Sequence, residues 1–231
     1  VDPNNGFFIS LDFELFWGWD DTSLSEAKVE RLKNTRKVIV KILELFEKYN
    51  ICATWATVGY LFAEDSKDLL SYYDNDFQVY DNENLNNFNK ISSIKDTFND
   101  CYFALDLLNK IKTQENQEIG SHTFSHFYAL EKGVTYKNFE DDILKGQLIA
   151  KNKGFGQNKS LVFPRNQVAY IEQLQNLGIQ YYRGNQVSYA YNGSDTKSSR
   201  NKFKRLVRFL DRYFNIYDHT YFLEEFNKDE N

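Results

Sequence analysis

Short apolar runs alternate with longer amphipathic segments along most of the chain. The short runs have the length and character of buried strands, and several end at Gly, Pro or a polar cluster. In the longer segments apolar residues recur every three or four positions, which is typical of helices with one buried face. The predicted strands cover residues 7–16, 51–58, 118–122, 160–163 and 179–182, and the predicted helices after the first cover residues 60–73, 101–112, 136–152 and 168–177.

The first and longest helical segment follows a capping-box signature. Ser23 and Glu26 have the spacing at which side chains and backbone cap a helix N-terminus. Behind them an apolar stripe runs from Val29 to Phe46. Further along the chain, Gly178 follows the helix predicted over 168–177 and is a suitable residue to end it.

This regular alternation predicts an α/β fold with a mainly parallel sheet. We expect one domain over residues 1–231. The stretch 74–100 interrupts the alternation, because it is rich in Asn and Asp and poorly periodic, and we interpret it as a long surface insertion. In parallel α/β folds functional residues gather at the carboxyl ends of the strands. The polar residues at such ends are Asp12, Glu14, His122, Arg165 and Arg183.

Composition narrows the classes of function. The net charge is −5, so no general attraction to nucleic acid is expected. No apolar run is long enough for a transmembrane helix. Cys52 and Cys101 form no Cys-x-x-Cys pair, which argues against a thiolate metal site and favours two reduced thiols.

Two of the three histidines, His122 and His126, stand four residues apart. On a helical turn this spacing places both imidazoles on one face, so both can bind one metal ion. Two neighbouring surface histidines would show the same spacing, and on spacing alone this alternative stays open.

Two acids, Asp12 and Glu14, interrupt the first apolar run. Burying a carboxylate is costly without a partner. Residues two apart in a strand point to the same side, so both carboxylates can converge on one point. They could instead be structural acids bonded to backbone or arginines. A metal ion would account for the acids and the histidines together.

Two histidines and one carboxylate leave coordination positions open, which is typical of a catalytic site. The second carboxylate is then available as a base toward water. Arg165, which follows an apolar strand, is a candidate to orient that base, because a guanidinium held against Asp12 would fix its geometry. The alternative is an ordinary surface arginine.

Three motifs carry a resemblance to a known family. They are Ser10-Leu11-Asp12-Phe13-Glu14, Ser121-His122-Thr123-Phe124-Ser125-His126 and Phe163-Pro164-Arg165-Asn166-Gln167, in that order. Together they resemble the polysaccharide deacetylases of the NodB-homology type (carbohydrate esterase family 4) over roughly residues 7–185. The resemblance implies a distorted (β/α)7 barrel. It also implies a catalytic base at Asp12, metal ligands at Glu14, His122 and His126, and a bracing arginine at Arg165.

The motifs also depart from the family pattern. The usual first motif has two adjacent aspartates, whereas here Phe13 separates Asp12 from a glutamate, so the base and ligand roles could be exchanged. The proline usually follows the motif arginine, whereas Pro164 precedes Arg165. Both departures resemble a divergent branch of the kind associated with surface-polysaccharide synthesis.

The family's late histidine, a general acid, has no clear match. The remaining histidine, His219, lies in a Tyr-Asp-His-Thr context that does not fit the motif. Three alternatives stay open: His219 serves, the acid lies in a segment beyond this chain, or there is no such acid. If the acid lies in a segment beyond this chain, the domain over residues 1–231 is incomplete at its C-terminal end.

The resemblance implies metal-dependent hydrolysis of an N-acetyl group from an amino sugar, in a polysaccharide or its precursor, with release of acetate. Zinc is the expected divalent metal, and the N-acetylated sugar is the expected partner. The alternatives are a hydrolase of another non-peptide C–N bond, a glycosidase of related barrel shape, and a catalytically inactive carbohydrate-binding barrel. A glycosidase keeps its two carboxyl groups apart across the substrate, whereas residues two apart would crowd one metal.

A basic amphipathic helix is predicted near the C-terminus. Lys204, Arg208 and Arg212 are spaced four apart, opposite an apolar stripe that includes Phe203 and Leu210. A solvated helix face is the simple interpretation, and contact with the phosphate of a nucleotide- or lipid-linked sugar is the alternative. Because no export signal is visible, we expect a cytoplasmic location, or an extracytoplasmic one if a signal has been trimmed.

Overall fold

The computed structural model describes residues 7–19, 24–73, 79–185, 190–191, 202–214 and 216–217. At its centre is a sheet of five parallel strands in the order β1-β2-β3-β4-β5, so that each strand pairs with the next one along the chain. The strands are β1 (Ser10–Phe13), β2 (Ala53–Thr57), β3 (Gln117–Ser121), β4 (Ser160–Val162) and β5 (Tyr181–Arg183).

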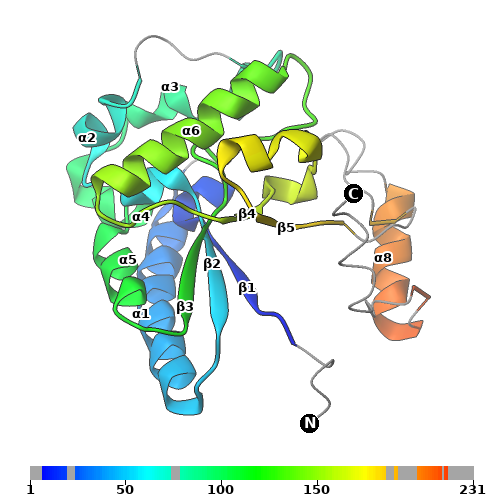
Figure 1. Ribbon diagram of the computed structural model, residues 1–231, viewed down its shortest axis with the longest axis horizontal. Coiled ribbons are helices and arrows are strands. Elements are labelled where there is room, and N and C mark those ends of the chain that lie inside the picture. Colours follow the sequence, from blue (N-terminus) through cyan, green and yellow to red (C-terminus); the bar gives the residue numbers. More distant parts are fainter. Residues whose placement is uncertain are drawn as a thin grey trace.

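The sheet curls instead of lying open and flat. Figure 1 shows β4 and β5 running across the direction of β1, β2 and β3. The curl brings the two edge strands together. Arg183 of β5 donates to Ser10 and Asp12 of β1, at 3.0 and 3.2 Å, which shows how close the two edges lie. A parallel sheet whose order never reverses turns continuously in one direction, as in a barrel. The predicted α/β fold of the distorted-barrel type is therefore confirmed.

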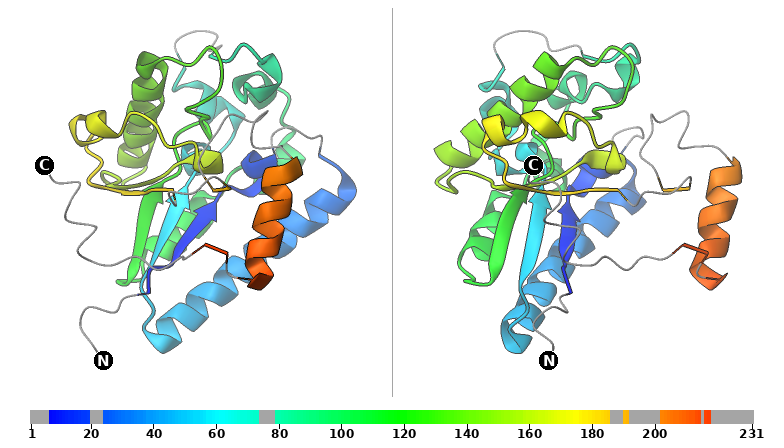
Figure 2. Two further views of the ribbon diagram at one scale, coloured as in Figure 1. Left: turned by 90° about the vertical axis from the view of Figure 1, so that its right-hand side faces the viewer. Right: turned by 45° about the vertical axis from the view of Figure 1, so that its right-hand side comes forward.

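Helices cover the outer side of the sheet (Figure 1). α1 (Glu26–Tyr49) and α5 (Leu105–Lys112) pack on each other and bury residues such as Leu43 and Leu108 beside Trp55 of β2. α6 (Tyr136–Asn152) contacts the helical turn Gly59–Phe62 that follows β2. The shorter helices are α2 (Ser66–Leu70), α3 (Phe88–Ile91) and α4 (Asn99–Tyr102), and α8 (Lys202–Phe214) lies apart from the sheet (Figure 2).

The predicted insertion at 74–100 is built into the domain. From residue 79 onward it contains α3 and two short 3-10 turns, Glu83–Leu85 and Asp96–Phe98. Several of its side chains are buried, including Tyr80, Leu85 and Ile91. The segment shows no hydrophobic periodicity because its helical turns are too short. A single turn does not repeat, so it produces no periodic sequence pattern.

Several local predictions were wrong. The helix expected over 60–73 is the 3-10 turn Gly59–Phe62 followed by α2, and the helix expected over 101–112 is divided into α4 and α5. The segment 168–177 forms two 3-10 turns, Ile171–Gln173 and Gln175–Leu177, because the chain turns through a left-handed Tyr170 (φ 57°). Gly178 does end the second turn in the left-handed conformation, as predicted. α1 begins at Glu26 with Ser25 as its N-cap, whose hydroxyl accepts from the Lys28 N–H at 3.4 Å, and the predicted cap residue Ser23 lies outside the described residues.

Gly59 permits a close backbone contact directly after β2. Its N–H donates to the carbonyl of Thr123 at 2.9 Å, and the next N–H, of Tyr60, donates to Phe124 at 3.1 Å. A Cβ at Gly59 would lie 2.8 Å from the Cα of Phe124. The loop after β3 thus rests on the backbone at the end of β2, and no side chain fits between them.

We expect Gly59→Ala to lower the free energy of unfolding by about 1–3 kcal/mol, because two backbone segments would have to separate. Gly146→Ala is the matched control. A Cβ there meets the same Phe124 at an ordinary 3.6 Å within α6, so alanine should be neutral or stabilise by up to ~1 kcal/mol. Urea denaturation measures both, and equal effects of the two substitutions would contradict the tight contact.

Candidate metal centre

Glu14 lies at the point where β1 ends. The next residue, Leu15, takes a left-handed conformation (φ 45°) and begins the 3-10 turn Leu15–Trp19. Gly18 lies on this turn beside the Glu14 carboxylate, and a Cβ there would overlap Oε1 and Cδ of Glu14. The missing side chain at Gly18 therefore makes room for the carboxylate in the position it occupies.

The two histidines lie on the loop after β3, and this loop is not a helical turn as the spacing suggested. His122 still donates its backbone N–H to Thr57 of β2 at 2.8 Å, so it extends the sheet ladder. Thr123 and His126 then adopt positive φ angles of 62° and 59°. The two imidazoles converge because the chain reverses twice at left-handed residues, which sequence spacing alone does not reveal.

A buried carboxylate holds this loop. Asp142 of α6 accepts the N–H of Phe124 at 2.7 Å, the N–H of Ser125 at 3.1 Å and the Ser125 hydroxyl at 2.5 Å. Burial raises the pKa of Asp142 to about 6, although these hydrogen bonds pull it down. Within the loop, Thr123 Oγ1 accepts the Phe127 N–H at 2.6 Å, which gives the threonine of the motif a structural role.

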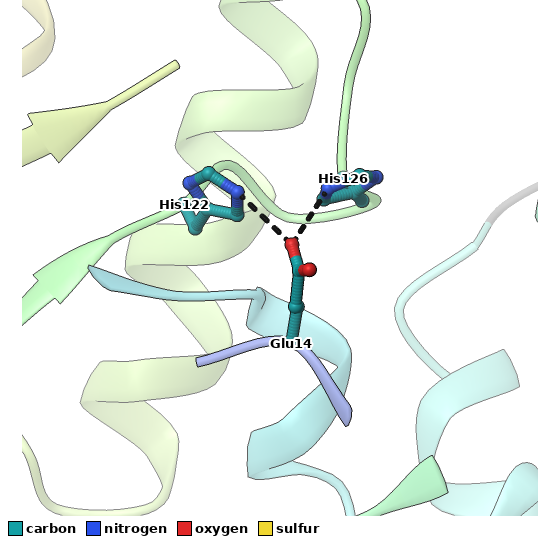
Figure 3. Close-up of side chains that lie close together, drawn as sticks. All are labelled: Glu14, His122 and His126. Carbon is teal, nitrogen blue, oxygen red and sulfur yellow. Dashed lines mark hydrogen bonds and ion pairs between the residues drawn. The ribbon is translucent and has the colours of Figure 1, made fainter. Parts of the chain in front are cut away.

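Glu14, His122 and His126 converge on one point, as Figure 3 shows. Oε2 of Glu14 lies 3.1 Å from Nε2 of His126 and 3.4 Å from Nε2 of His122. Nδ1 of His122 donates to the Val162 carbonyl at 2.8 Å, and Nδ1 of His126 is hydrogen-bonded to the Tyr128 hydroxyl at 3.0 Å. Such outer contacts orient imidazoles whose other nitrogen binds a metal.

Burial and hydrogen bonding set the charges at this point. Burial disfavours an ionised Glu14, but the hydrogen bonds and charges of the two histidines outweigh it and hold the pKa of Glu14 well below its usual value. Burial lowers the pKa of His122, against the raising effect of Glu14. An ionised carboxylate beside a neutral imidazole is the state in which both act as metal ligands.

The donor set fits a divalent metal. Because Nδ1 of His122 carries the proton given to Val162, the neutral ring presents a lone pair at Nε2, toward the carboxylate of Glu14. A proton on Nε2 allows the ring to donate to Glu14, and a metal ion would take the place of that proton between the two ligand atoms. Two imidazole nitrogens and one carboxylate oxygen, all within 4.8 Å of one another, match the ligand set of catalytic zinc sites.

The second acid, Asp12, lies beside this group and is paired with Arg183. The two guanidinium nitrogens of Arg183 lie 3.0 Å from Oδ1 and 3.2 Å from Oδ2 of Asp12, in a bidentate arrangement. Asp12 is close enough to raise the pKa of His122 by its charge. The Asp12 side chain is 40% exposed and that of Glu14 is 32% exposed, so the site opens to solvent on its carboxylate side.

Arg165 was the arginine predicted to brace Asp12, and the structure gives that contact to Arg183. Arg165 takes a left-handed conformation (φ 53°) in the turn Pro164–Asn166, and its guanidinium carbon lies 4.2 Å from the centre of the Tyr128 ring. The turn carries the side chain toward the ring that supports His126. The sequence signal that could have identified Arg183 as the partner of Asp12 was its location at the end of a predicted strand.

The predicted site residues thus fall into two groups. The structure brings together Glu14, His122 and His126, the three residues predicted to be metal ligands, and Asp12 lies beside them. His219, one of the alternatives for the general acid, lies outside the described residues.

Comparisons with known proteins place the chain near two solved structures. No protein-family model and no curated protein matches the sequence. One similar structure is a CE4 family pseudoenzyme from Bacillus anthracis, with 12% identity, a TM-score of 0.43 and coverage of 80% of this chain. This chain spans only 45% of that structure's chain. The other is a de-N-acetylase from Aggregatibacter actinomycetemcomitans, with 14% identity, a TM-score of 0.41 and coverage of 76% of this chain and 70% of the other.

We expect Gly18→Ala to weaken the binding of a divalent metal by roughly 10- to 100-fold, the usual effect of disturbing a ligand's support. The new methyl group would displace the Glu14 carboxylate, the far end of a flexible side chain, without disturbing the backbone. Competition with a chromogenic chelator measures the affinity. Gly184→Ala is the control, because its Cβ would meet only a Tyr182 ring carbon at 3.7 Å. Unchanged zinc affinity in Gly18→Ala would contradict the placement of Glu14.

Proposed function

We propose that this protein is a metal-dependent N-deacetylase that releases acetate from an N-acetylated amino sugar. The observation that carries the proposal is the convergence of Glu14, His122 and His126 next to an acid, Asp12, that is held by Arg183. A metal-ligand set beside a separately oriented carboxylate is the arrangement that hydrolysis of an amide by activated water requires.

Glu14, His122 and His126 would hold the metal, and zinc suits a site with two imidazoles and one carboxylate. When bound, such an ion acts as a Lewis acid that polarises a carbonyl and acidifies water. The protein's own contribution begins with geometry. His122 and His126 are almost fully buried and anchored through Nδ1, so the ligand set is preorganised before the metal arrives.

Asp12 is the proposed general base. Its carboxylate stands next to the ligand group without belonging to it, and it can accept the proton of the attacking water. Arg183 contacts both oxygens of Asp12 and thereby fixes the direction of its lone pairs. This arrangement favours Asp12 as the base and Glu14 as the ligand, which is one of the two assignments that the first motif left open.

A sugar substrate is supported by two features. The order and spacing of the three motifs resemble those of polysaccharide deacetylases, and the half-exposed carboxylate side of the site gives a bulky substrate access. The buried side is closed by aromatic residues such as Phe124 and Tyr128, which are about 1% exposed or less. An acetamide group can therefore reach the site from the solvent side while the rest of a glycan stays outside.

We expect His122→Ala and Asp12→Asn to abolish acetate release by different routes. His122→Ala should purify without zinc, because one of three ligands is lost. Asp12→Asn should retain about one zinc per chain by elemental analysis, while its turnover falls by roughly 10²- to 10⁴-fold, the usual contribution of a general base. Acetate is assayed with N-acetylglucosamine oligomers. Full activity in zinc-loaded Asp12→Asn would rule out the base assignment.

A second function is favoured by one observation. Both histidines of the described residues are used as ligands, which leaves the proton donor for the leaving amine unassigned among those residues. A catalytically inactive carbohydrate-binding barrel would need no such donor. Binding of acetylated oligomers to the zinc-loaded protein without any acetate release would support this second function. Release from a formamide or cyclic ureide, but not from sugars, would instead indicate a hydrolase of another C–N bond.

We expect Arg183→Gln to lower kcat by roughly 10- to 100-fold at unchanged zinc content, because Asp12 would lose its orientation. Arg165→Gln is the matched comparison, since that side chain lies over Tyr128 and not against Asp12. Its kcat should fall less than that of Arg183→Gln. The reverse order, with kcat more sensitive to Arg165, would restore the role first predicted for Arg165.

A further inference from the structure

Helix α8 displays much of its apolar side to solvent, while Val207 and Leu210 on that side are half-buried. Its exposed apolar residues recur on one side of the helix and are 51 to 72% exposed; they are Phe203, Leu206, Phe209, Tyr213 and Phe214. We call this set the apolar arc. A helix of a globular domain ordinarily turns such a side toward the core. Figure 2 shows α8 standing apart from the sheet and its covering helices.

The helix is held by its opposite, polar side. Asp211 is 4% exposed and accepts the hydroxyl of Tyr191 at 2.7 Å and the N–H of Tyr217 at 2.8 Å. One turn earlier, Arg208 donates to the carbonyl of Ala190 at 3.3 Å. Polar contacts therefore fix the helix with its apolar arc outward. The arrangement is the inverse of core packing.

The charges of α8 indicate what covers the arc. The helix carries five basic residues and one acid, in a chain whose net charge is −5. Arg205 and Arg212 are exposed, and with Arg208, Tyr191 and Phe209 they line a hollow of about 400 Å³. Guanidinium groups next to an exposed apolar arc match a surface that combines phosphate groups with hydrocarbon.

A second copy of the chain is a poorer match for this side of α8. In a two-fold symmetric contact each arc would meet its own copy, which brings Arg205 and Arg212 close to the same arginines. Like charges facing each other oppose association. A lipid surface that contains anionic headgroups offers apolar contact and opposite charge at once.

We propose that α8 is an interfacial helix that binds the protein to the surface of an anionic lipid membrane. The apolar arc enters the boundary between headgroups and acyl chains, and Arg205 and Arg212 contact lipid phosphates. The helix lies along the surface, since none of the described helices is long and apolar enough to cross a membrane. This inference is independent of the deacetylase proposal, because it uses no residue of the metal centre.

Vesicle sedimentation of the full chain tests the proposal. We expect the protein to pellet with vesicles of mixed phosphatidylcholine and phosphatidylglycerol, and to stay in solution with phosphatidylcholine alone. Arg205→Gln with Arg212→Gln should lower the partition coefficient about 30-fold, which corresponds to ~1 kcal/mol for each arginine near an anionic surface. Leu206→Gln with Tyr213→Gln should lower it at least about tenfold through lost apolar burial.

Matched controls on α1 have the same seven-residue spacing. Lys41→Gln with Lys48→Gln removes two exposed charges, and Val38→Gln with Leu45→Gln removes two exposed apolar side chains. Neither pair should change partitioning by more than about twofold if binding depends on α8. Circular dichroism and the thermal midpoint of each variant establish that the fold is retained.

Three outcomes would overturn the proposal. The full chain could fail to pellet with anionic vesicles. It could pellet equally well with both pairs of α8 substitutions. The protein could instead fail to bind vesicles and form a dimer in sedimentation equilibrium. If Leu206→Gln with Tyr213→Gln dissociated that dimer, the apolar arc would be assigned to a second copy of the chain.

Discussion

The hydrogen bonds to the carboxylate of Asp142 are the interaction on which the geometry of the candidate metal centre depends. It accepts two backbone N–H groups and one hydroxyl from Phe124 and Ser125, within the segment that separates His122 from His126. Hydrogen bonds to a charged group contribute about 1.5–3 kcal/mol each, and their loss would leave buried donors unsatisfied. Burying the charge of Asp142 in α6 is unfavourable, but its hydrogen bonds offset this and hold a loop with two left-handed residues in one conformation. Gly59 supports the same loop from the other side by allowing the backbone of β2 to approach it.

The curl of the sheet creates the second half of the site. β1 and β5 are the two edges of the strand order, yet Arg183 of β5 contacts both Ser10 and Asp12 of β1. In a flat sheet these edges would be four strand spacings apart, roughly 19 Å. The ion pair can form only because the strands turn continuously in one direction. Asp12 consequently receives its partner from the far edge of the sheet, while Glu14, two residues later, faces the histidine loop beyond β3.

The metal centre and α8 use burial in opposite ways. At the centre, polar ligands are buried among aromatic residues and satisfied by hydrogen bonds such as the one from His122 to Val162. In α8 a buried Asp211 fixes the helix, and the apolar arc is left exposed. Exposed apolar surface is costly in water, so the apolar arc indicates contact with something other than water, and the converging polar ligands at the centre fit a bound cation. For the first we propose a metal ion and an acetylated sugar, and for the second an anionic lipid surface.

The sequence by itself determined the α/β class, the order of the strands along the chain and the three residues, Glu14, His122 and His126, that the structure brings together as candidate metal ligands. These follow from local signals: apolar runs of strand length, two acids inside such a run, and two histidines four apart. Only the tertiary structure decided that Arg183 and not Arg165 pairs with Asp12, because that contact joins residues 171 positions apart across a curled sheet. It also decided that the histidines meet through left-handed residues and not through a helical turn, and that the apolar arc of α8 faces outward while Val207 and Leu210 of the predicted stripe are half-buried. Periodicity reports which residues share a face of an element, whereas the direction of that face depends on contacts from distant parts of the chain.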